Sequence, residues 1–256
     1  AFMSNAKMNV TTKDTLRNTQ SEQAITIEGT DIIVRFGKQH SGLESYQYKG
    51  KEMLQSALTP RFTRPLTDND KRGWKPQKKL KQWYDTAYTQ QKTTLTKGTN
   101  GSLLVNTSYG FIHDSAVVKI QYQINTTGII QVDYTLIVKP GLPNIPKVGM
   151  QLGVDQSYLT IDWYGRGPFE NYIDKRTSAD VGLYQKPIEA FMETYIVPQE
   201  SGNKTDVRWM QFGNDNKEGI VIVADSLLSM NASLYTEANI MAAKHTNKLT
   251  KSGQIY

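Results

Sequence analysis

Residues 163–176 contain the densest group of chemically capable side chains in this sequence. The stretch reads Trp-Tyr-Gly-Arg-Gly-Pro-Phe-Glu-Asn-Tyr-Ile-Asp-Lys-Arg and combines aromatic rings with carboxylate, amide and guanidinium groups. Planar polar groups beside aromatic rings are suited to holding a sugar. With a second polar stretch at 195–208 they give eight candidates for sugar contact or for a network that closes the loops: Tyr164, Arg166, Glu170, Asn171, Tyr172, Glu200, Asn203 and Arg208.

A strand is expected to carry the first of these polar stretches. Leu159-Thr-Ile-Asp-Trp163 alternates apolar and polar residues, which predicts a half-buried strand that leads directly into the cluster. Loops held by a rigid sheet are a common place for binding residues. Trp163 and Trp209, both on predicted strands, are interpreted as core residues. Arg166 and Glu170 flank a Gly-Pro turn, and we expect them to share one polar network.

Metal or cofactor chemistry is not expected from this sequence. The three histidines, His40, His113 and His245, are scattered without ligand spacing. Asp68, Asn69 and Asp70 could offer oxygens to a hard cation, but acidic and amide residues after a proline favour a structural turn that caps its own backbone. No nucleophile elbow, phosphate-binding loop or dinucleotide motif is present.

Three motifs carry a resemblance to a known family. Tyr164-Gly-Arg-Gly-Pro-Phe-Glu-Asn-Tyr-Ile-Asp-Lys175 resembles a signature of the C-terminal domain (small chain, domain 5) of bacterial β-galactosidases of glycoside hydrolase family 2. Phe62-Thr-Arg-Pro-Leu-Thr-Asp-Asn-Asp70 is similar to a second family motif, with Pro65 one place early. Tyr195-Ile-Val-Pro-Gln-Glu-Ser-Gly-Asn203 is similar to a third. The motifs occur in the family's order, and the resemblance runs from about Ile25 to Tyr256.

The resemblance implies a fold, a parent enzyme and a role. The fold would be the large two-sheet supersandwich shared with galactose mutarotases. The parent would hydrolyse terminal β-D-galactosides with retention, using an acid and a nucleophile on a central α/β barrel. Retention needs two carboxylates about 5–5.5 Å apart, and Glu170 and Glu200 are the best-placed pair here. No alternation of strands and helices that would build a barrel is visible, so no catalytic residue is expected in this chain.

The expected role is therefore that of a non-catalytic domain that packs on the catalytic barrel and helps to shape the active-site mouth. Its partner would be the rest of its own polypeptide, with the β-galactoside contacted only indirectly and a homo-oligomer possible. The alternative is a carbohydrate-binding module or mutarotase-like sugar binder that acts alone. The loops 164–172 and 195–203 are expected to expose an apolar patch toward the barrel.

Composition limits the remaining classes. The chain has 256 residues, no cysteine and a net charge of +6, much of it from a basic run at 71–81. This run resembles a polyanion patch, but no nucleic-acid motif accompanies it, so we interpret it as a solvated face and expect no nucleic-acid partner. No apolar run reaches the roughly 20 residues of a membrane helix, and no membrane partner is expected. The cytoplasm and the periplasm of a bacterium both remain open.

Alternating segments along the chain predict an all-β antiparallel fold. Residues 1–22 are predicted to be a linker or disordered arm, and 23–256 a single β-supersandwich domain, truncated at its C-terminus as part of a longer protein. Gly219–Ala224 is a continuous apolar run, which predicts a strand buried on both faces. Short helices are expected within 77–84 and 187–194. The other predicted strands lie at 24–28, 31–36, 43–49, 102–109, 117–124, 129–138, 147–153 and 209–213.

Overall fold

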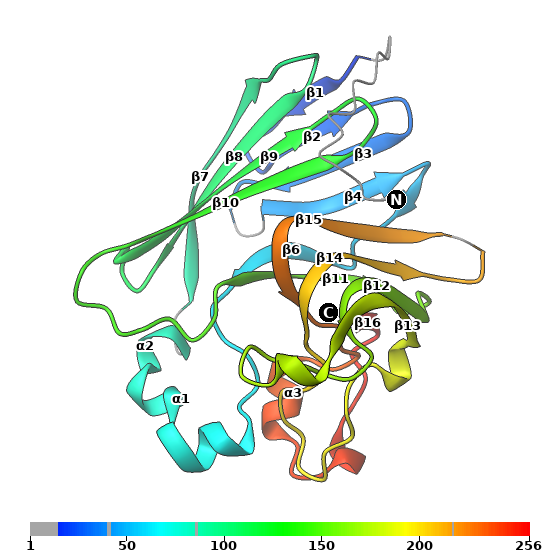
Figure 1. Ribbon diagram of the computed structural model, residues 1–256. Coiled ribbons are helices and arrows are strands. Elements are labelled where there is room, and N and C mark those ends of the chain that lie inside the picture. Colours follow the sequence, from blue (N-terminus) through cyan, green and yellow to red (C-terminus); the bar gives the residue numbers. More distant parts are fainter. Residues whose placement is uncertain (1–14, 40–41, 85–86, 217) are drawn as a thin grey trace. The chain divides into compact units, whose positions relative to one another are not determined.

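Antiparallel strands dominate the computed structural model, which describes residues 15–39, 42–84, 87–216 and 218–256 (Figure 1). These residues fall into two compact units. The first unit combines the described residues up to Glu52 with residues 87–142, and the second combines the described residues of 53–84 and 143–256. The prediction of an all-β antiparallel fold is confirmed. The mutarotase-like supersandwich and the single domain over 23–256 stay predictions.

The first unit contains two antiparallel sheets. In one sheet the strands follow the order β1-β2-β3-β4, with β5 paired to β4, and in the other the order is β10-β9-β8-β7. Sequential strands are neighbours throughout, as expected when short turns connect them. The strands are β1 (Arg17–Gln20), β2 (Ala24–Glu28), β3 (Ile32–Gly37), β4 (Gly42–Tyr48), β5 (Lys51–Glu52), β7 (Tyr88–Lys97), β8 (Leu103–Phe111), β9 (Ala116–Ile124) and β10 (Ile130–Val138).

The two sheets of the first unit share an apolar core. Phe36 of β3 meets Tyr122 of β9 with ring centroids 5.0 Å apart, so a residue from each sheet contributes to the same contact. Along β9, buried residues alternate with more exposed ones, as required for a sheet with one face in the core. The polar face of the β7–β10 sheet points away from this core.

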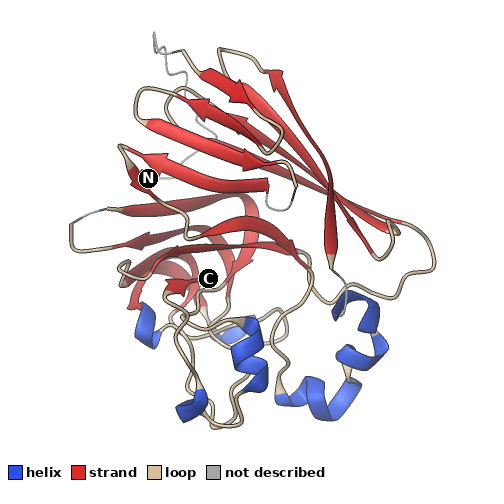
Figure 2. Cartoon of the chain, turned by 180° about the vertical axis from the view of Figure 1, so that it is seen from behind, coloured by secondary structure: helices blue, strands red, loops and turns tan. Residues whose placement is uncertain are grey.

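The second unit also contains two antiparallel sheets, and it carries all the described helices (Figure 2). Strands β6, β11 and β16 are neighbours in that order within one sheet, and the other sheet has the order β13-β12-β14-β15. The strands are β6 (Ser56–Arg61), β11 (Gly149–Asp155), β12 (Thr160–Gly167), β13 (Asp180–Pro187), β14 (Lys204–Gly213), β15 (Gly219–Met230) and β16 (Gln254–Ile255). The helices are η1 (Asp70–Trp74), α1 (Pro76–Lys79), α2 (Lys81–Tyr84), η2 (Arg176–Ser178), η3 (Ile188–Ala190), α3 (Glu237–Ala242) and η4 (Thr246–Lys248).

The two faces of the β13-β12-β14-β15 sheet differ because side chains alternate along each strand. On the inner face, Trp163 is fully buried, lies opposite Tyr184 and Met210, and packs edge-on against Phe191 with centroids 5.6 Å apart. The next residue along β12, Tyr164, is only half-buried. Trp163 is therefore a core residue, as predicted.

Two sequence predictions are wrong within these strands. Gly219–Ala224 begins β15, which lies at the edge of its sheet, and Val221 and Val223 are 54% and 69% exposed rather than buried. A continuous apolar run does not reveal that the outer face of its strand lacks a covering layer. Trp209 is half-buried on that outer face and is not a core residue.

The predicted N-terminal arm is partly structured. Residues 1–14 lie outside the described residues, but Arg17–Gln20 form β1, which pairs with β2. All four side chains of β1 are exposed, so the strand lacks the apolar alternation that would identify it from sequence. The sequence patterns also do not predict β5, β6, β7 and β13. The expected helix at 77–84 appears as α1 and α2, and that at 187–194 as the short η3.

Gly42 provides a test of packing in the first unit. Its φ is +53°, and a Cβ at this position would collide with the hydroxyl of Tyr109, which is fully buried and cannot move aside. We expect Gly42→Ala to lower the free energy of unfolding by about 2–4 kcal/mol, from the left-handed backbone and the overpacking together. Urea unfolding followed by circular dichroism measures this loss.

Gly50→Ala is the matched control for this variant. Gly50 also has a positive φ, +77°, but nothing lies within 4 Å of a Cβ there. Its substitution should cost only the backbone strain, about 1 kcal/mol. Equal losses in the two variants would contradict the packing of Gly42 against Tyr109.

Candidate functional site

The three sequence motifs meet in the second unit. The backbone N–H of Asp68, in the 62–70 motif, donates to the Gln199 side chain of the 195–203 motif at 2.8 Å. The backbone N–H of Asn171, in the 164–175 motif, donates to the Asn203 carbonyl at 2.8 Å, and the Asn203 side chain donates back to the Asn171 carbonyl at 2.7 Å. The motifs are thus parts of one hydrogen-bonded structure, referred to below as the loop network.

Glu170 joins the first and third motifs through its carboxylate. Its Oε1 accepts from the Lys175 ammonium at 2.6 Å and the Tyr195 hydroxyl at 2.5 Å, while Oε2 accepts from the Gly202 N–H at 3.0 Å. Burial alone raises the pKa of the Glu170 carboxyl, but these three donors hold that pKa below its ordinary value. The bond to Glu170 in turn raises the pKa of Tyr195 to about 12. Glu170 is therefore an ionised carboxylate that accepts from three donors.

Gly202 connects the carboxylate of Glu170 to a buried lysine. Its N–H donates to Glu170, and its carbonyl accepts from Lys204 Nζ at 2.7 Å. Lys204 is fully buried, and its ammonium lies 4.4 Å from the ring centroid of Phe191 and 5.4 Å from that of Trp163. Burial lowers the pKa of Lys204 to about 8. Gly202 has φ +84°, so few other residues could take its place.

Asn171 is fully buried with every polar group bonded. Its Nδ2 donates to the carbonyl of Phe169 at 2.9 Å and to that of Arg166 at 3.3 Å. Its Oδ1 accepts from the N–H and hydroxyl of Thr205, at 2.8 and 2.5 Å. These bonds fasten the loop after β12 to the start of β14, so Asn171 is a structural clamp without a free group for a ligand.

Arg166 pairs with a residue that sequence did not single out. Its Nε donates to Asp206 Oδ2 at 2.5 Å, and its NH1 donates to the Ala179 carbonyl at 2.7 Å. Arg176 lies 3.8 Å from the other oxygen of Asp206. Arg166 and Glu170 have different ion-pair partners, Asp206 and Lys175, and their expected membership of one polar network stays a prediction. Asn171, bonded to the Arg166 carbonyl, connects them.

Tyr164 and Arg208 lie together on the outer face of the sheet. The Arg208 guanidinium carbon is 5.1 Å from the Tyr164 ring centroid, and its NH1 donates to the Asp206 carbonyl at 2.6 Å. Tyr164 is also the strand partner of Trp209. A ring already stacked by arginine is a poorer platform for a sugar, because its face is shared.

Glu200 and Tyr172 occupy a more enclosed position. Glu200 is 9% exposed and accepts from Asn231 Nδ2 at 3.3 Å. Burial raises the pKa of Glu200 above its ordinary value, although Lys147 and nearby cations act in the opposite direction. The Tyr172 hydroxyl is buried. Burial, followed by the charge of Glu200, raises the pKa of Tyr172.

The acidic triplet of the second motif lies at the start of η1. Asp70 is buried, and its Oδ2 accepts from the Thr67 N–H at 2.9 Å and pairs with Arg64 at 2.8 Å. Its Oδ1 accepts from the indole of Trp74 at 2.9 Å. The bond to Thr67 is the backbone contact that the turn interpretation predicts for residues 68–70. Asn69 immediately precedes η1 as its N-cap and makes no side-chain capping bond.

No group of three or more His, Cys, Asp or Glu arranged to hold a metal ion lies among the described residues. Within the same residues, no helix is long and apolar enough to cross a membrane. The basic run at 71–81 lies on η1, α1 and α2.

Sequence reasoning missed several members of the loop network. Lys175 and Tyr195 were inside the quoted motifs but were not selected, because an alternating pattern does not show which donors reach a carboxylate. Asp206 and Thr205 lie in β14, outside the motifs, and no sequence signal marks them. Lys204 was not singled out, because lysine side chains are seldom buried, and only the packing of the second unit shows that it is buried.

Comparison with known proteins gives a consistent result. A family model described as β-galactosidase small chain matches residues 28–256. The chain is similar to the β-galactosidases of Priestia megaterium, 30% identical over 92% of this chain, and Halalkalibacterium halodurans, 31% identical over 88%. It is also similar to that of Streptococcus thermophilus, 27% identical over 89%. The matched regions cover 23%, 23% and 22% of these relatives, so the chain spans about a quarter of their length.

Removal of the Glu170 carboxylate tests the loop network. Glu170→Ala leaves the buried Gly202 N–H and the Tyr195 hydroxyl without their acceptor, and we expect a loss of about 2–4 kcal/mol in the free energy of unfolding. Thermal and urea unfolding measure it. Glu189→Ala is the control, because the Glu189–Lys251 ion pair is exposed and should contribute little. A loss no larger than that of the control would disprove the role of Glu170.

The two carboxylates should respond to pH in opposite directions. The pKa of Glu200 is raised by folding, so its contribution to stability falls as pH rises from the ordinary value through the folded-state pKa. The free energy of unfolding of Glu200→Gln should therefore rise relative to that of the wild type as the pH increases from about 4 to about 7.5. The pKa of Glu170 is lowered, so its contribution is present above the ordinary value and is lost as pH falls through the folded-state pKa.

The free energy of unfolding of Glu170→Gln should consequently fall relative to that of the wild type over the same rise in pH. Urea unfolding of the wild type and both variants at the two pH values gives these differences directly. Parallel trends in the two variants would show that the electrostatic environments of Glu170 and Glu200 are not opposed.

Proposed function

The chain belongs to the β-galactosidase small-chain family, and on that premise we propose that it is a non-catalytic β-sheet domain of a β-galactosidase. In the complete polypeptide it packs on the catalytic α/β barrel and helps to shape the mouth of the active site. The parent enzyme hydrolyses terminal β-D-galactosides. One observation carries the proposal: the Glu170 carboxylate, the best-placed acid of the motifs, accepts hydrogen bonds from three groups of the loop network.

The acid of a glycosidase must donate a proton at the pH of the reaction. The second carboxylate must either attack the sugar as a nucleophile or activate a water molecule as a base. The lowered pKa of Glu170 disfavours the role of acid, and the three donors that bind its carboxylate oxygens disfavour nucleophilic attack. Glu200 has a raised pKa, but its side chain is almost closed to solvent. These properties support a structural role for both carboxylates.

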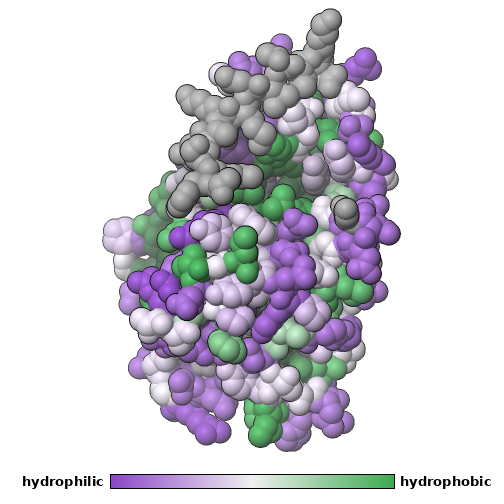
Figure 3. Space-filling view, turned by 45° about the vertical axis from the view of Figure 1, so that its right-hand side comes forward, coloured by the Kyte–Doolittle hydropathy of each residue, from purple (hydrophilic) through white to green (hydrophobic). Residues whose placement is uncertain are grey.

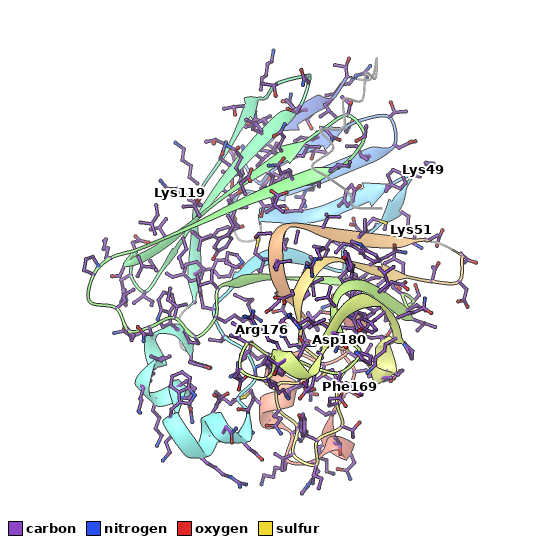
Figure 4. All side chains as sticks on the ribbon, viewed as in Figure 1. Lys49, Lys51, Lys119, Phe169, Arg176 and Asp180 are labelled. Atoms are coloured by element: carbon purple, nitrogen blue, oxygen red, sulfur yellow. The ribbon has the colours of Figure 1, made fainter. Side chains whose placement is uncertain are left out.

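The loops that Glu170 joins end in exposed apolar side chains. Phe169, Ile173 and Ile196 are 63%, 80% and 82% exposed, and all lie within three residues of Glu170 or Tyr195. Figure 4 shows Phe169 at the same end of the second unit as Arg176. Isoleucine and phenylalanine side chains this exposed favour a surface that another protein region covers.

The outer face of the β13-β12-β14-β15 sheet adds further apolar area. Leu183, Tyr164, Trp209 and Val223 are successive strand partners across all four strands, and Leu183 is 71% exposed. Figure 3 shows hydrophobic residues interspersed with hydrophilic ones on one face of the molecule. The relatives are about four times longer than this chain, which leaves ample protein to cover such surfaces.

Activity measurements test the proposal in two steps. The isolated chain should release no nitrophenol from nitrophenyl β-galactoside. Release that disappears in Glu170→Gln or Glu200→Gln would overturn the non-catalytic role. In the complete polypeptide, Ile173→Asp or Ile196→Asp should lower kcat/KM by roughly tenfold or more, because a charge would be buried at the contact with the barrel.

Leu159→Asp is the matched control in the complete polypeptide. Leu159 is also an exposed apolar residue, at 56%, but it precedes β12, whereas Ile173 follows that strand at its other end. Its substitution should leave kcat/KM close to wild type. Equal effects of all three variants would count against a docking surface at the loops 169–173 and 195–196.

A further inference from the structure

The outward face of the β7–β10 sheet in the first unit is hollowed into a groove. The groove has a volume of about 450 Å³ and takes lining residues from all four strands. This volume falls in the range of roughly 300–1,000 Å³ that small-molecule sites occupy. The family motifs and the loop network lie in the second unit, so neither explains the groove.

The groove is lined by two adjacent cross-strand rows of polar residues. The first row, here called the cationic row, contains successive strand partners: Lys92, Ser108, Lys119 and Thr135. The second, here called the amide row, contains Thr94, Asn106, Gln121 and Asp133. Because strand partners lie side by side and alternate residues share a face, each row presents four side chains to the hollow.

The cationic row is suited to bind an anion. Lys92 and Lys119 lie two strands apart, roughly 10 Å by the usual strand spacing, with the hydroxyl of Ser108 between them. Neither lysine forms an ion pair with any described residue. Their flexible stems allow both ammonium groups to converge on one carboxylate or sulfate.

The amide row is prearranged for hydroxyl groups. Gln121 Nε2 donates to Asn106 Oδ1 at 2.8 Å, which fixes both amides in a ladder across β8 and β9. Asp133 at the end of the row accepts from Gln131 at 3.3 Å and keeps further acceptor capacity. Amides and a carboxylate in fixed positions accept from and donate to the hydroxyls of a sugar ring.

An apolar row borders the cationic row on its other side. Val117 is the strand partner of both Gly110 and Ile137, and Ile137 is 47% exposed. A pyranose has an apolar C–H face as well as hydroxyls, and this row offers it a surface. A plain solvent-facing sheet is polar too and is curved by its twist, so it is the arrangement of lysines, amides and aliphatic residues in adjacent rows that supports a site.

We propose that this groove binds an anionic oligosaccharide, with the acidic group on the cationic row and neighbouring hydroxyls on the amide row. Carboxylated and sulfated sugar units share the required chemistry. A nucleic acid fits less well, because among the described lining residues no aromatic side chain is present to stack a base. The groove would hold an acidic glycan on the surface of the domain, separately from the surfaces proposed to contact the barrel.

Titration calorimetry of the 256-residue chain tests the proposal with four probes. These are a galacturonate trisaccharide, a sulfated galactan tetrasaccharide, a neutral galactan tetrasaccharide and a single-stranded oligonucleotide. At least one acidic saccharide should bind, more weakly at higher salt, and the neutral saccharide should bind much less. The two acidic probes distinguish carboxylate from sulfate. Failure of both to bind, or equal binding of the oligonucleotide, would overturn the proposal.

Variants then locate the site. Lys92→Gln and Lys119→Gln should each weaken binding of the acidic saccharide about fivefold, equivalent to about 1 kcal/mol. Gln121→Ala should weaken it by a similar factor without changing its salt dependence. Lys49→Gln is the matched control, because it removes the same charge from the turn after β4, away from Lys119 (Figure 4). An equal loss in Lys49→Gln would show unspecific attraction to a basic protein and would contradict the groove.

Discussion

The buried contact between Glu170 and Gly202 is the interaction on which the loop end of the second unit depends. Gly202 gives its N–H to the carboxylate of Glu170 and its carbonyl to the ammonium of Lys204, so one peptide segment lies between a buried anion and a buried cation. Each charge is expensive to bury alone. Held together through Gly202, and with the rings of Phe191 and Trp163 beside the ammonium, they fix the 195–203 loop against both the 168–175 loop and the core.

Electrostatic environment separates two glutamates that look alike in sequence. Glu170 meets an ammonium, a phenol and a backbone N–H, and these donors outweigh the effect of its burial. Glu200 accepts a hydrogen bond from the Asn231 amide and lies near the buried hydroxyl of Tyr172. Burial is therefore the largest influence on the pKa of Glu200 and raises it. Glu170 and Glu200 are therefore both carboxylates, like the acid and the nucleophile of a glycosidase, but their surroundings are not suited to those two roles. The bonds of Glu170 give this carboxylate a structural role in a domain proposed to be non-catalytic.

The sheets of the two units present different outer faces for the same geometric reason. Alternation along a strand sends every second residue outward, and the strand register aligns those residues into rows. In the second unit the row is Leu183, Tyr164, Trp209 and Val223, which suits a protein contact. In the first unit two rows are polar and line a hollow. A fold of this kind supplies separate surfaces, and the identity of outward residues decides what each surface contacts.

The sequence by itself determined the family, the all-β class and most strands, because motif order and two-residue periodicity are local properties of the chain. It identified Ala24–Glu28 as a strand with its observed bounds, and it placed Trp163 in the core. It missed β1 and mistook Gly219–Ala224 for a buried strand, since hydropathy does not show whether a second layer covers a face. Tertiary structure alone decided that Arg166 pairs with Asp206, that Lys204 is buried, and that polar rows of four strands meet in one groove. Each of these depends on which distant segments become neighbours, and pairing between strands is set by packing of the whole unit rather than by any local pattern.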